Sequence, residues 1–319
     1  AEMVRFGKNG SDVTTAAIRL ARAYTGRKKI AICGYHSWHD WFIGTTSRNL
    51  GVPKEVSKLS YNFNFNDLDQ AEKLIKSDVN GFAAIIIEPE NSIKPKKGFL
   101  KGLRNLANKY GIVLIFDEIV SGFRSNLGGA QKKYKVTPDL STFGKGMANG
   151  MPISAIVGKK DIMILMNKIF FSGTFGGETL SIAAANATIK KLIEKNAPSV
   201  FKKLGTNYVK NINKFINYYN LDHIMEMKGV DWRPIISFRG FDKASDIEIT
   251  SLFRQELLKH GIIMGSGINL SLAHNDDRII KKTLNIIEKS MYNLNEYLKL
   301  DNPLSKLDGD SIKPVFQVR

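Results

Sequence analysis

Lys145 is the residue in this sequence whose neighbours most favour chemistry. It lies in the run Ser141–Gly146, among small and apolar residues, shortly after Pro138 and Asp139. A lysine held in apolar surroundings loses its proton more easily, and the neutral amine is the form that attacks an aldehyde. Most lysines are solvated surface residues, so Lys145 alone is weak evidence. Its meaning depends on the side chains that the fold brings near it.

Acidic residues directly follow two strand-like apolar runs. The run 83–87 is followed by Glu88, and the run 112–116 is followed by Asp117 and Glu118. In an open α/β sheet the ligand crevice lies outside the carboxyl ends of the strands, so these acids are expected beside it. For either run alone, acids that merely end a strand in a loop are the ordinary alternative. Asp117 could hold a pyridinium nitrogen protonated, which is the role that a pyridoxal phosphate (PLP) site gives to an acid.

Two further segments offer groups for the phosphate and the ring of such a cofactor. Gly10 and Ser11, at a predicted helix start, supply free backbone N–H groups and a hydroxyl, which by themselves form only an N-terminal cap. The turn 35–39 supplies an aromatic face from Tyr35, and Ile119 could press the opposite face of a flat ring. The spacing of the two histidines in this turn also suggests a metal site. No third ligand is evident, so no metal is predicted.

The elements that must position these residues alternate along the first two thirds of the chain. Short β-branched runs and amphipathic helical patterns follow one another, which is typical of βαβ units on a mostly parallel sheet. The runs 29–33, 83–87 and 112–116 are predicted strands. Helical spacing predicts a first helix over 13–24. The expected fold class is therefore α/β, with a central sheet flanked by helices.

From about Lys195 the pattern changes. It indicates a helix, two short strand-like runs over 234–238 and 261–264, and a long final helix capped by Asn275 or Asp276. We therefore expect a large domain over residues 1–194 and a smaller C-terminal α+β domain over residues 195–319.

Composition limits the partners and the compartment. The chain has 319 residues and a formal net charge of +17, but its lysines are scattered in short doublets without a basic arm, so no nucleic-acid partner is expected. The lone cysteine, Cys33, excludes a disulfide within the monomer and favours the cytoplasm. No apolar stretch is long enough for a membrane helix, and no membrane association is expected.

Several motifs in this order resemble the class III, fold-type I PLP-dependent aminotransferases, the branch that contains glutamate-1-semialdehyde aminomutase. The most specific stretch is Ile115–Arg124, followed by Pro138–Leu140 and by Gly144-Lys145. The resemblance runs from about Val4 to at least Lys195 and resumes at 271–274. It implies the fold-type I architecture and PLP as cofactor.

The resemblance also implies roles for the residues that meet the cofactor. Lys145 matches the lysine that forms the internal aldimine, a Schiff base with PLP, and Asp117 matches the acid that pairs with the pyridine nitrogen. Tyr35 matches the residue that stacks on the ring, and His36 of the same turn and Ile119 also belong to the expected cofactor-binding set.

Other residues match positions around the phosphate and behind the site. Gly10 and Ser11 match the Gly-Thr phosphate turn of the family, and Thr174 matches the threonine that reaches the phosphate of the neighbouring subunit. This implies a homodimer with shared active sites. Glu88 and Glu118 match acids that lie behind the cofactor-binding residues.

The sequence departs from the family pattern at a few positions. Ser37 stands where relatives usually have glycine, and Val120 stands where many have a glutamine; both changes are expected to tune cofactor binding rather than abolish it. The run Gly176–Leu180 replaces a Ser-Gly-Asn-Pro-Leu motif of the aminomutases, which weakens a strict aminomutase reading. The role of Arg124, in the Gly-Phe-Arg motif, stays open. Relatives carry a substantial segment before the phosphate turn, so we expect a truncated form.

The resemblance implies an aminotransferase that moves an amino group between a small-molecule amino donor and a small aldehyde or ketone. One alternative is another reaction of the same cofactor, namely intramolecular amino transfer as in an aminomutase, racemisation or decarboxylation. A second alternative is a PLP-fold fragment without turnover. A third is a basic protein that binds anions or nucleic acid.

Overall fold

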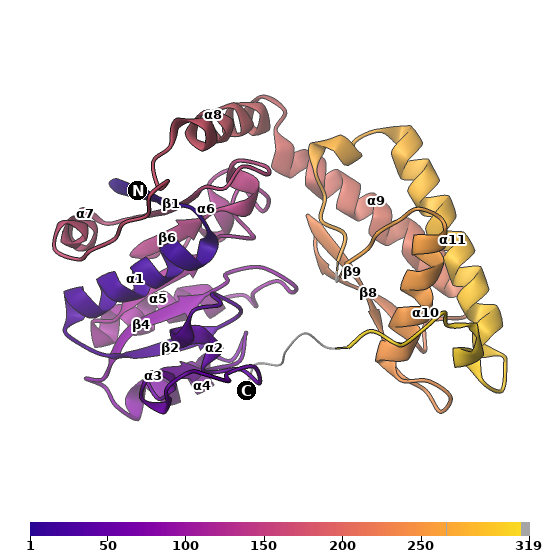
Figure 1. Cartoon of the computed structure of the whole chain (residues 1–319), viewed down its shortest axis with the longest axis horizontal. Coiled ribbons are helices and arrows are strands. Elements are labelled where there is room, and N and C mark those ends of the chain that lie inside the picture. Colours follow the sequence, from indigo (N-terminus) through magenta and orange to yellow (C-terminus); the bar gives the residue numbers. More distant parts are fainter. Residues whose placement is uncertain (266, 314–319) are drawn as a thin grey trace. The chain divides into compact units, whose positions relative to one another are not determined.

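The computed structural model describes residues 1–265 and 267–313, and the chain divides into two compact units. Among the described residues, unit 1 consists of Ala1–Asn91 with Pro95–Ala197, and unit 2 consists of Ser92–Lys94 with residues 198–313. The strands and helices that carry the predicted site residues all belong to unit 1 (Figure 1).

Within the described residues, unit 1 contains a seven-stranded sheet with the strand order β1-β7-β6-β5-β4-β2-β3. Neighbours from β3 through β6 pair in parallel, and β7 pairs antiparallel with both β1 and β6. The expected mostly parallel sheet is confirmed, and three predicted strands lie within one residue of their observed bounds. The strands are β1 Met3–Gly7, β2 Lys29–Cys33, β3 Ser60–Asn62, β4 Phe82–Ile87, β5 Val113–Asp117, β6 Leu140–Phe143 and β7 Ser154–Gly158.

Helices cover both faces of this sheet, and each face has its own apolar core. Successive strand residues point to opposite faces, so Ile115 packs in the core that contains α1, whereas Phe116 packs in the core that contains α5. Burial on both faces explains why the central strands are continuous apolar runs. The helices of unit 1 are α1 Gly10–Thr25, α2 Asp40–Ile43, α3 Lys54–Ser57, α4 Leu68–Lys76, α5 Phe99–Tyr110, α6 Gly129–Tyr134, η1 Lys145–Met147, α7 Lys160–Met163, η2 Ile164–Asn167 and α8 Thr179–Glu194.

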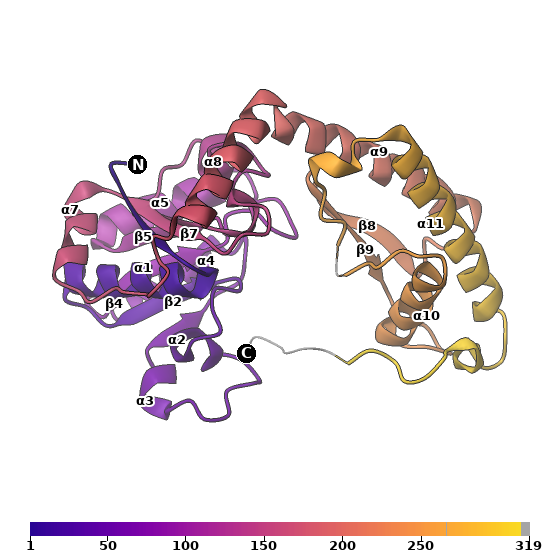
Figure 2. The same cartoon turned by 45° about the horizontal axis from the view of Figure 1, so that its top comes forward.

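Unit 2 combines long helices with an antiparallel hairpin (Figure 2). The final helix begins after Asp276, whose side chain accepts a hydrogen bond from the Arg278 N–H, so one of the two predicted caps is confirmed. None of the helices among the described residues is both long and apolar enough to cross a membrane. The elements are α9 Ala197–Tyr218, β8 Met225–Val230, β9 Arg233–Phe238, α10 Asp246–Lys259, η3 Leu272–His274, α11 Asp277–Leu298 and η4 Pro303–Lys306.

The strand predicted over 261–264 was wrong. Gly261 has φ +83° and its N–H donates to the Leu258 carbonyl, so it ends α10, and Ile263 is 91% exposed. The strand that pairs with β9 is instead β8, which contains Lys228 and Gly229 and lacks a continuous apolar pattern. A hairpin strand held mainly by backbone pairing carries little of the periodic signal on which the prediction depended.

Candidate functional site

A pocket of about 340 Å³ lies in unit 1 at the carboxyl ends of the central strands. It contains most of the predicted site residues, with the exceptions of Glu118 and Thr174. Its lining residues come from the segments that follow β2, β4, β5 and β6 and from the first turn of α1, as expected for an open α/β sheet. The lining residues are Asn9, Gly10, Ser11, Tyr35, His36, Trp38, Glu88, Asp117, Ile119, Val120 and Lys145.

The first turn of α1 lines this pocket and carries backbone N–H groups that lie before the helix's own hydrogen bonds. Asn9 is the N-terminal cap: its side chain accepts a hydrogen bond from the Asp12 N–H, and the Asp12 carboxylate accepts one from the Asn9 N–H. The N–H groups of Gly10 and Ser11 come before the first intrahelical hydrogen bonds and have no partner within the helix. The Ser11 hydroxyl accepts a hydrogen bond from the Trp38 N–H. This turn therefore offers an anion two backbone donors and the positive end of the helix dipole.

Asp117 is a buried carboxylate at the end of β5, and three groups hold its orientation. Its Oδ1 accepts hydrogen bonds from the Ile119 N–H at 3.1 Å and from the Thr142 hydroxyl at 3.2 Å, and its Oδ2 lies 2.8 Å from His36 Nδ1. The other ring nitrogen of His36 lies 3.2 Å from the Cys33 carbonyl oxygen. His36 is itself buried, so it lies in the wall of the pocket and holds Asp117 from the side.

The turn after β2 that carries Tyr35 is fixed by Glu88. The Tyr35 N–H donates to Glu88 Oε2 at 3.0 Å, and the Asn91 amide donates to Glu88 Oε1 at 2.8 Å. Gly34 has φ +114°, and an added Cβ there would lie 2.7 Å from Glu88 Oε2, so only glycine fits. Burial, and then the charge of Asp117, raise the pKa of Glu88. Tyr35 is 44% exposed, and its ring lies edge-on to Phe42 with the ring centroids 5.2 Å apart.

Lys145 lies in the turn after β6 with a left-handed backbone conformation, φ +40°. Its side chain is exposed, which corrects the expectation of an apolar environment. The apolar neighbours in sequence point elsewhere, because Phe143 and Met147 pack in a separate cluster with Ile153 and Ala185. The flanking apolar residues therefore support the turn rather than enclose the lysine.

Glu118 does not line the pocket. It is fully buried, and its carboxylate accepts hydrogen bonds from the Ser121 hydroxyl and from the N–H groups of Ala130 and Gln131, both at 2.9 Å. Burial raises its pKa. Glu118 thus caps the first turn of α6, which agrees with a position behind the residues that line the pocket.

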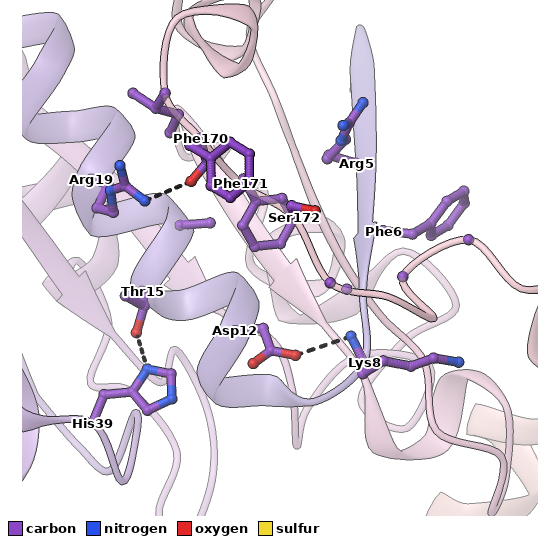
Figure 3. A pocket seen from close by; sticks show the side chains of 16 residues that line it. Arg5, Phe6, Lys8, Asp12, Thr15, Arg19, His39, Phe170, Phe171 and Ser172 are labelled. Carbon is purple, nitrogen blue, oxygen red and sulfur yellow. Dashed lines mark hydrogen bonds between the residues drawn. The ribbon is translucent and has the colours of Figure 1, made fainter.

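Thr174 lies outside the 340 Å³ pocket. It belongs to an exposed segment beside a second, larger pocket of about 540 Å³. Figure 3 shows that pocket, where side chains of β1 and α1 face the segment that follows η2. In it the Arg19 guanidinium donates to the Phe170 carbonyl at 2.8 Å, and the Thr15 hydroxyl lies 2.7 Å from His39 Nδ1. His39 and His36 thus have different partners.

Lys8 and Glu178 form an ion pair that sequence reasoning missed. The Lys8 ammonium lies 2.7 Å from Glu178 Oε1 and donates to the Pro152 carbonyl at 3.0 Å. Hydrogen bonding from Lys8, and then from Ser181, lowers the pKa of Glu178 to about 2. The pair joins the turn before α1 to the first turn of α8. The sequence signal was the glutamate in Gly176–Leu180, a position first read only as a departure from a motif.

The sequence comparisons gave both a family model and close relatives. The model described as Aminotransferase class-III matches residues 1–270. The chain is 40% identical over 270 residues to a 3-aminobutyryl-CoA aminotransferase of Cloacimonas acidaminovorans, an alignment that covers 82% of this chain and 64% of that protein. The chain thus spans less than two thirds of that relative. It is 33% identical over 323 residues to a glutamate-1-semialdehyde 2,1-aminomutase of Ignicoccus hospitalis, covering 91% of this chain and 74% of that protein.

Solved structures of transaminases share the fold. The FumI protein of a Sphingopyxis species, solved in its PLP internal aldimine form, has a TM-score of 0.84 at 26% identity and covers 96% of this chain and 75% of its own. A transaminase with PLP bound has a TM-score of 0.85 at 24% identity, covering 92% of this chain and 74% of its own. The predicted fold-type I architecture is confirmed by the sheet and by these likenesses.

Proposed function

Because the chain belongs to the class III aminotransferase family, as its motifs predicted, we propose that it binds PLP in the 340 Å³ pocket and transfers amino groups. Its substrates would be an amino donor and a small aldehyde or ketone. The observation that carries the proposal is that Lys145, Asp117 and the first turn of α1 line one pocket.

The residues of the pocket fit the parts of PLP. The N–H groups of Gly10 and Ser11 suit a phosphate, and the buried carboxylate of Asp117 suits a protonated ring nitrogen. Tyr35 and Ile119 supply apolar surface for a flat ring. The volume, about 340 Å³, falls within the range of small-molecule pockets.

Each of these residues would have a defined task. When bound, PLP supplies an electron sink for charge that develops at the substrate carbon. Asp117 would keep a proton on the ring nitrogen, and His36 would hold the Asp117 carboxylate in place from the side. The Lys145 amine would hold the cofactor and, as a free base, would move a proton at the substrate carbon.

The proposal is tested by visible absorbance. Purified protein incubated with PLP should acquire an absorbance band that is absent from the Lys145→Ala variant. Lys97→Ala, at a lysine that does not line the pocket, is the control and should keep the band. A protein that binds no PLP, or that binds it equally well without Lys145, would contradict the proposal.

Aminomutase activity is the second candidate, because a relative named as an aminomutase is 33% identical over most of this chain. The two reactions differ in their products. Supplied with one amino donor and one carbonyl acceptor, an aminotransferase releases a new keto product, whereas an aminomutase isomerises a single substrate. Product analysis by mass spectrometry therefore separates the two candidates.

A homodimer with shared sites is part of the proposal. Thr174 is exposed and outside the pocket of its own subunit, which supports a role at the site of a neighbouring subunit. Phe170 and Phe175, in the same segment, are 83% and 66% exposed, which is typical of residues that pack against a partner. We also propose a cytoplasmic location, because the single cysteine, Cys33, is buried as a free thiol.

A further inference from the structure

Two segments that follow neighbouring strands pack against each other beside the pocket. We name them the β5 loop, residues 118–124, and the β6 turn, residues 143–147. Ile119 of the β5 loop covers Gly144 of the β6 turn: an added Cβ at Gly144 would lie 3.2 Å from Ile119 Cδ1. A side chain at this position would require Ile119 to shift by a few tenths of an ångström, so the two segments are in close contact here.

Both segments contain a non-glycine residue in the left-handed conformation. Phe123 has φ +62° and Lys145 has φ +40°. L-residues rarely adopt this conformation, and it persists only where surrounding contacts enforce it. The Phe123 ring packs on the ring of Phe143, with centroids 5.7 Å apart, so part of the enforcement comes from contact between the two segments.

Arg124 makes the remaining connection. Its Nη1 donates to the Val120 carbonyl at 2.7 Å, which folds the end of the β5 loop back over its middle. Its guanidinium then lies against Gly146, where an added Cβ would be 3.4 Å from Cζ and 3.5 Å from Nη2. The arginine therefore lies between a carbonyl of the pocket-lining Val120 and the residue directly after Lys145.

From these contacts we infer that Arg124 is a positioning residue, which holds the β6 turn so that Lys145 enters the pocket in its left-handed conformation. Arginine suits this task because its planar group can donate to the carbonyl and lie along a glycine backbone at the same time. A lysine could donate to the carbonyl, but it has no plane to cover Gly146. The inference rests on the proposed function of Lys145 and gives the arginine of the Gly-Phe-Arg motif a role.

The test compares Arg124→Ala and Arg124→Lys with the wild-type chain. We expect Arg124→Ala to weaken PLP binding roughly tenfold, the order of one charge-assisted hydrogen bond, and to shift the pH at which the visible absorbance of bound PLP changes. Arg124→Lys should restore affinity only in part. Arg22→Ala is a matched control, since Arg22 Nε also donates to a backbone carbonyl, that of Lys28, at the other end of α1. It should leave affinity and pH profile unchanged.

A second measurement does not need the cofactor. In PLP-free protein, the rate at which an amine-reactive reagent labels Lys145, read by peptide mass spectrometry, should change several-fold in Arg124→Ala and not in Arg22→Ala. Melting temperatures separate a folding defect from a positioning defect. If Arg124→Ala lowers only the melting temperature, and leaves PLP affinity, pH profile and Lys145 labelling unchanged, the inference is overturned. If wild-type protein binds no PLP while the labelling rate responds, the proposed function fails and the positioning role stands.

Discussion

At the scale of single residues, Asp117 carries the most specific chemistry. It is 3% exposed and accepts hydrogen bonds from the Ile119 N–H and the Thr142 hydroxyl, with His36 at 2.8 Å. Asp117→Asn keeps the shape but removes the negative charge that would retain the ring proton. We expect turnover to fall roughly 100-fold or more, with a small change in melting temperature.

The matched variant for this prediction is Asp161→Asn. Asp161 is exposed, accepts a hydrogen bond from the Tyr24 hydroxyl and does not line the pocket. Steady-state kinetics and thermal melts of both variants give the comparison. Equal turnover in Asp117→Asn and wild-type protein would mean that Asp117 does not act on the cofactor.

The same residues mark what the sequence could predict. That Asp117 and Lys145 line one pocket could be expected because their types, their order and the strand ends before them are local features. Thr142 could not be found, because it meets Asp117 through the register of β5 with β6, and a shift of one residue would turn the hydroxyl to the other face. The exposure of Lys145 was also missed, since sequence neighbours do not show which way each side chain points.

At the scale of elements, the Lys8–Glu178 pair ties α8 to the turn before α1. The pKa of Glu178 is about 2 in the folded protein and 4.5 ordinarily, so its charged carboxylate stabilises the fold at pH values above 4.5. This contribution is lost as pH falls from 4.5 through about 2. Glu178→Gln should therefore lower the melting temperature at neutral pH, and the difference from wild type should shrink as the solution is acidified.

A surface ion pair serves as the reference for that experiment. Glu72 of α4 pairs with Lys76, whose side chain is 56% exposed against 23% for Lys8, so solvent screening leaves the Glu72 pair less net stabilisation. Glu72→Gln should change the melting temperature less than Glu178→Gln at neutral pH. A Glu178→Gln effect that is constant from neutral pH to about pH 2 would show that the charge of Glu178 is not its cause.

The start of α6 depends on a glycine beside a buried acid. Gly129 has φ +75°, and an added Cβ would lie 2.5 Å from Glu118 Oε1. Gly129→Ala combines a strained backbone with a clash, and we expect a loss of about 3 kcal/mol or more in the free energy of unfolding. Gly51 also has a positive φ, +85°, with nothing within 4 Å of an added Cβ.

Gly51→Ala serves as the control, because it strains the backbone without a clash. We expect it to lower the free energy of unfolding by about 1 kcal/mol. Denaturant unfolding of the two variants measures the difference. Equal losses at both positions would mean that α6 and Glu118 move apart at little cost, and that Glu118 does not fix the start of the helix.

At the scale of the whole molecule, the described pocket is built from unit 1 alone. The central strands at whose ends it lies were the most predictable part of the structure. Continuous apolar runs identified β2, β4 and β5 because strands buried on both faces need apolar residues at every position. The hairpin strand β8 lacks that requirement and was missed. The place of Thr174 relative to the pocket depends on chain folding over long sequence distances, which a motif match does not encode.

The homodimer proposal makes a prediction that only an assembled molecule can satisfy. Lys145→Ala and Thr174→Ala should each weaken PLP binding, because one lacks the anchoring amine and the other lacks a phosphate partner. If Thr174 serves the site of the neighbouring subunit, a mixed dimer of the two variants contains one site with both Lys145 and Thr174. Co-expression with two affinity tags isolates that mixed dimer.

Visible absorbance of the mixed dimer then reports whether an intact site has formed. We expect PLP affinity at one site per dimer to match the wild-type protein, because Lys145 comes from one chain and Thr174 from the other. If Thr174 acted within its own subunit, every site of the mixed dimer would lack one of the two residues and no recovery would be seen. Light scattering of the wild-type chain is the accompanying check, since a monomer in solution would contradict shared sites directly.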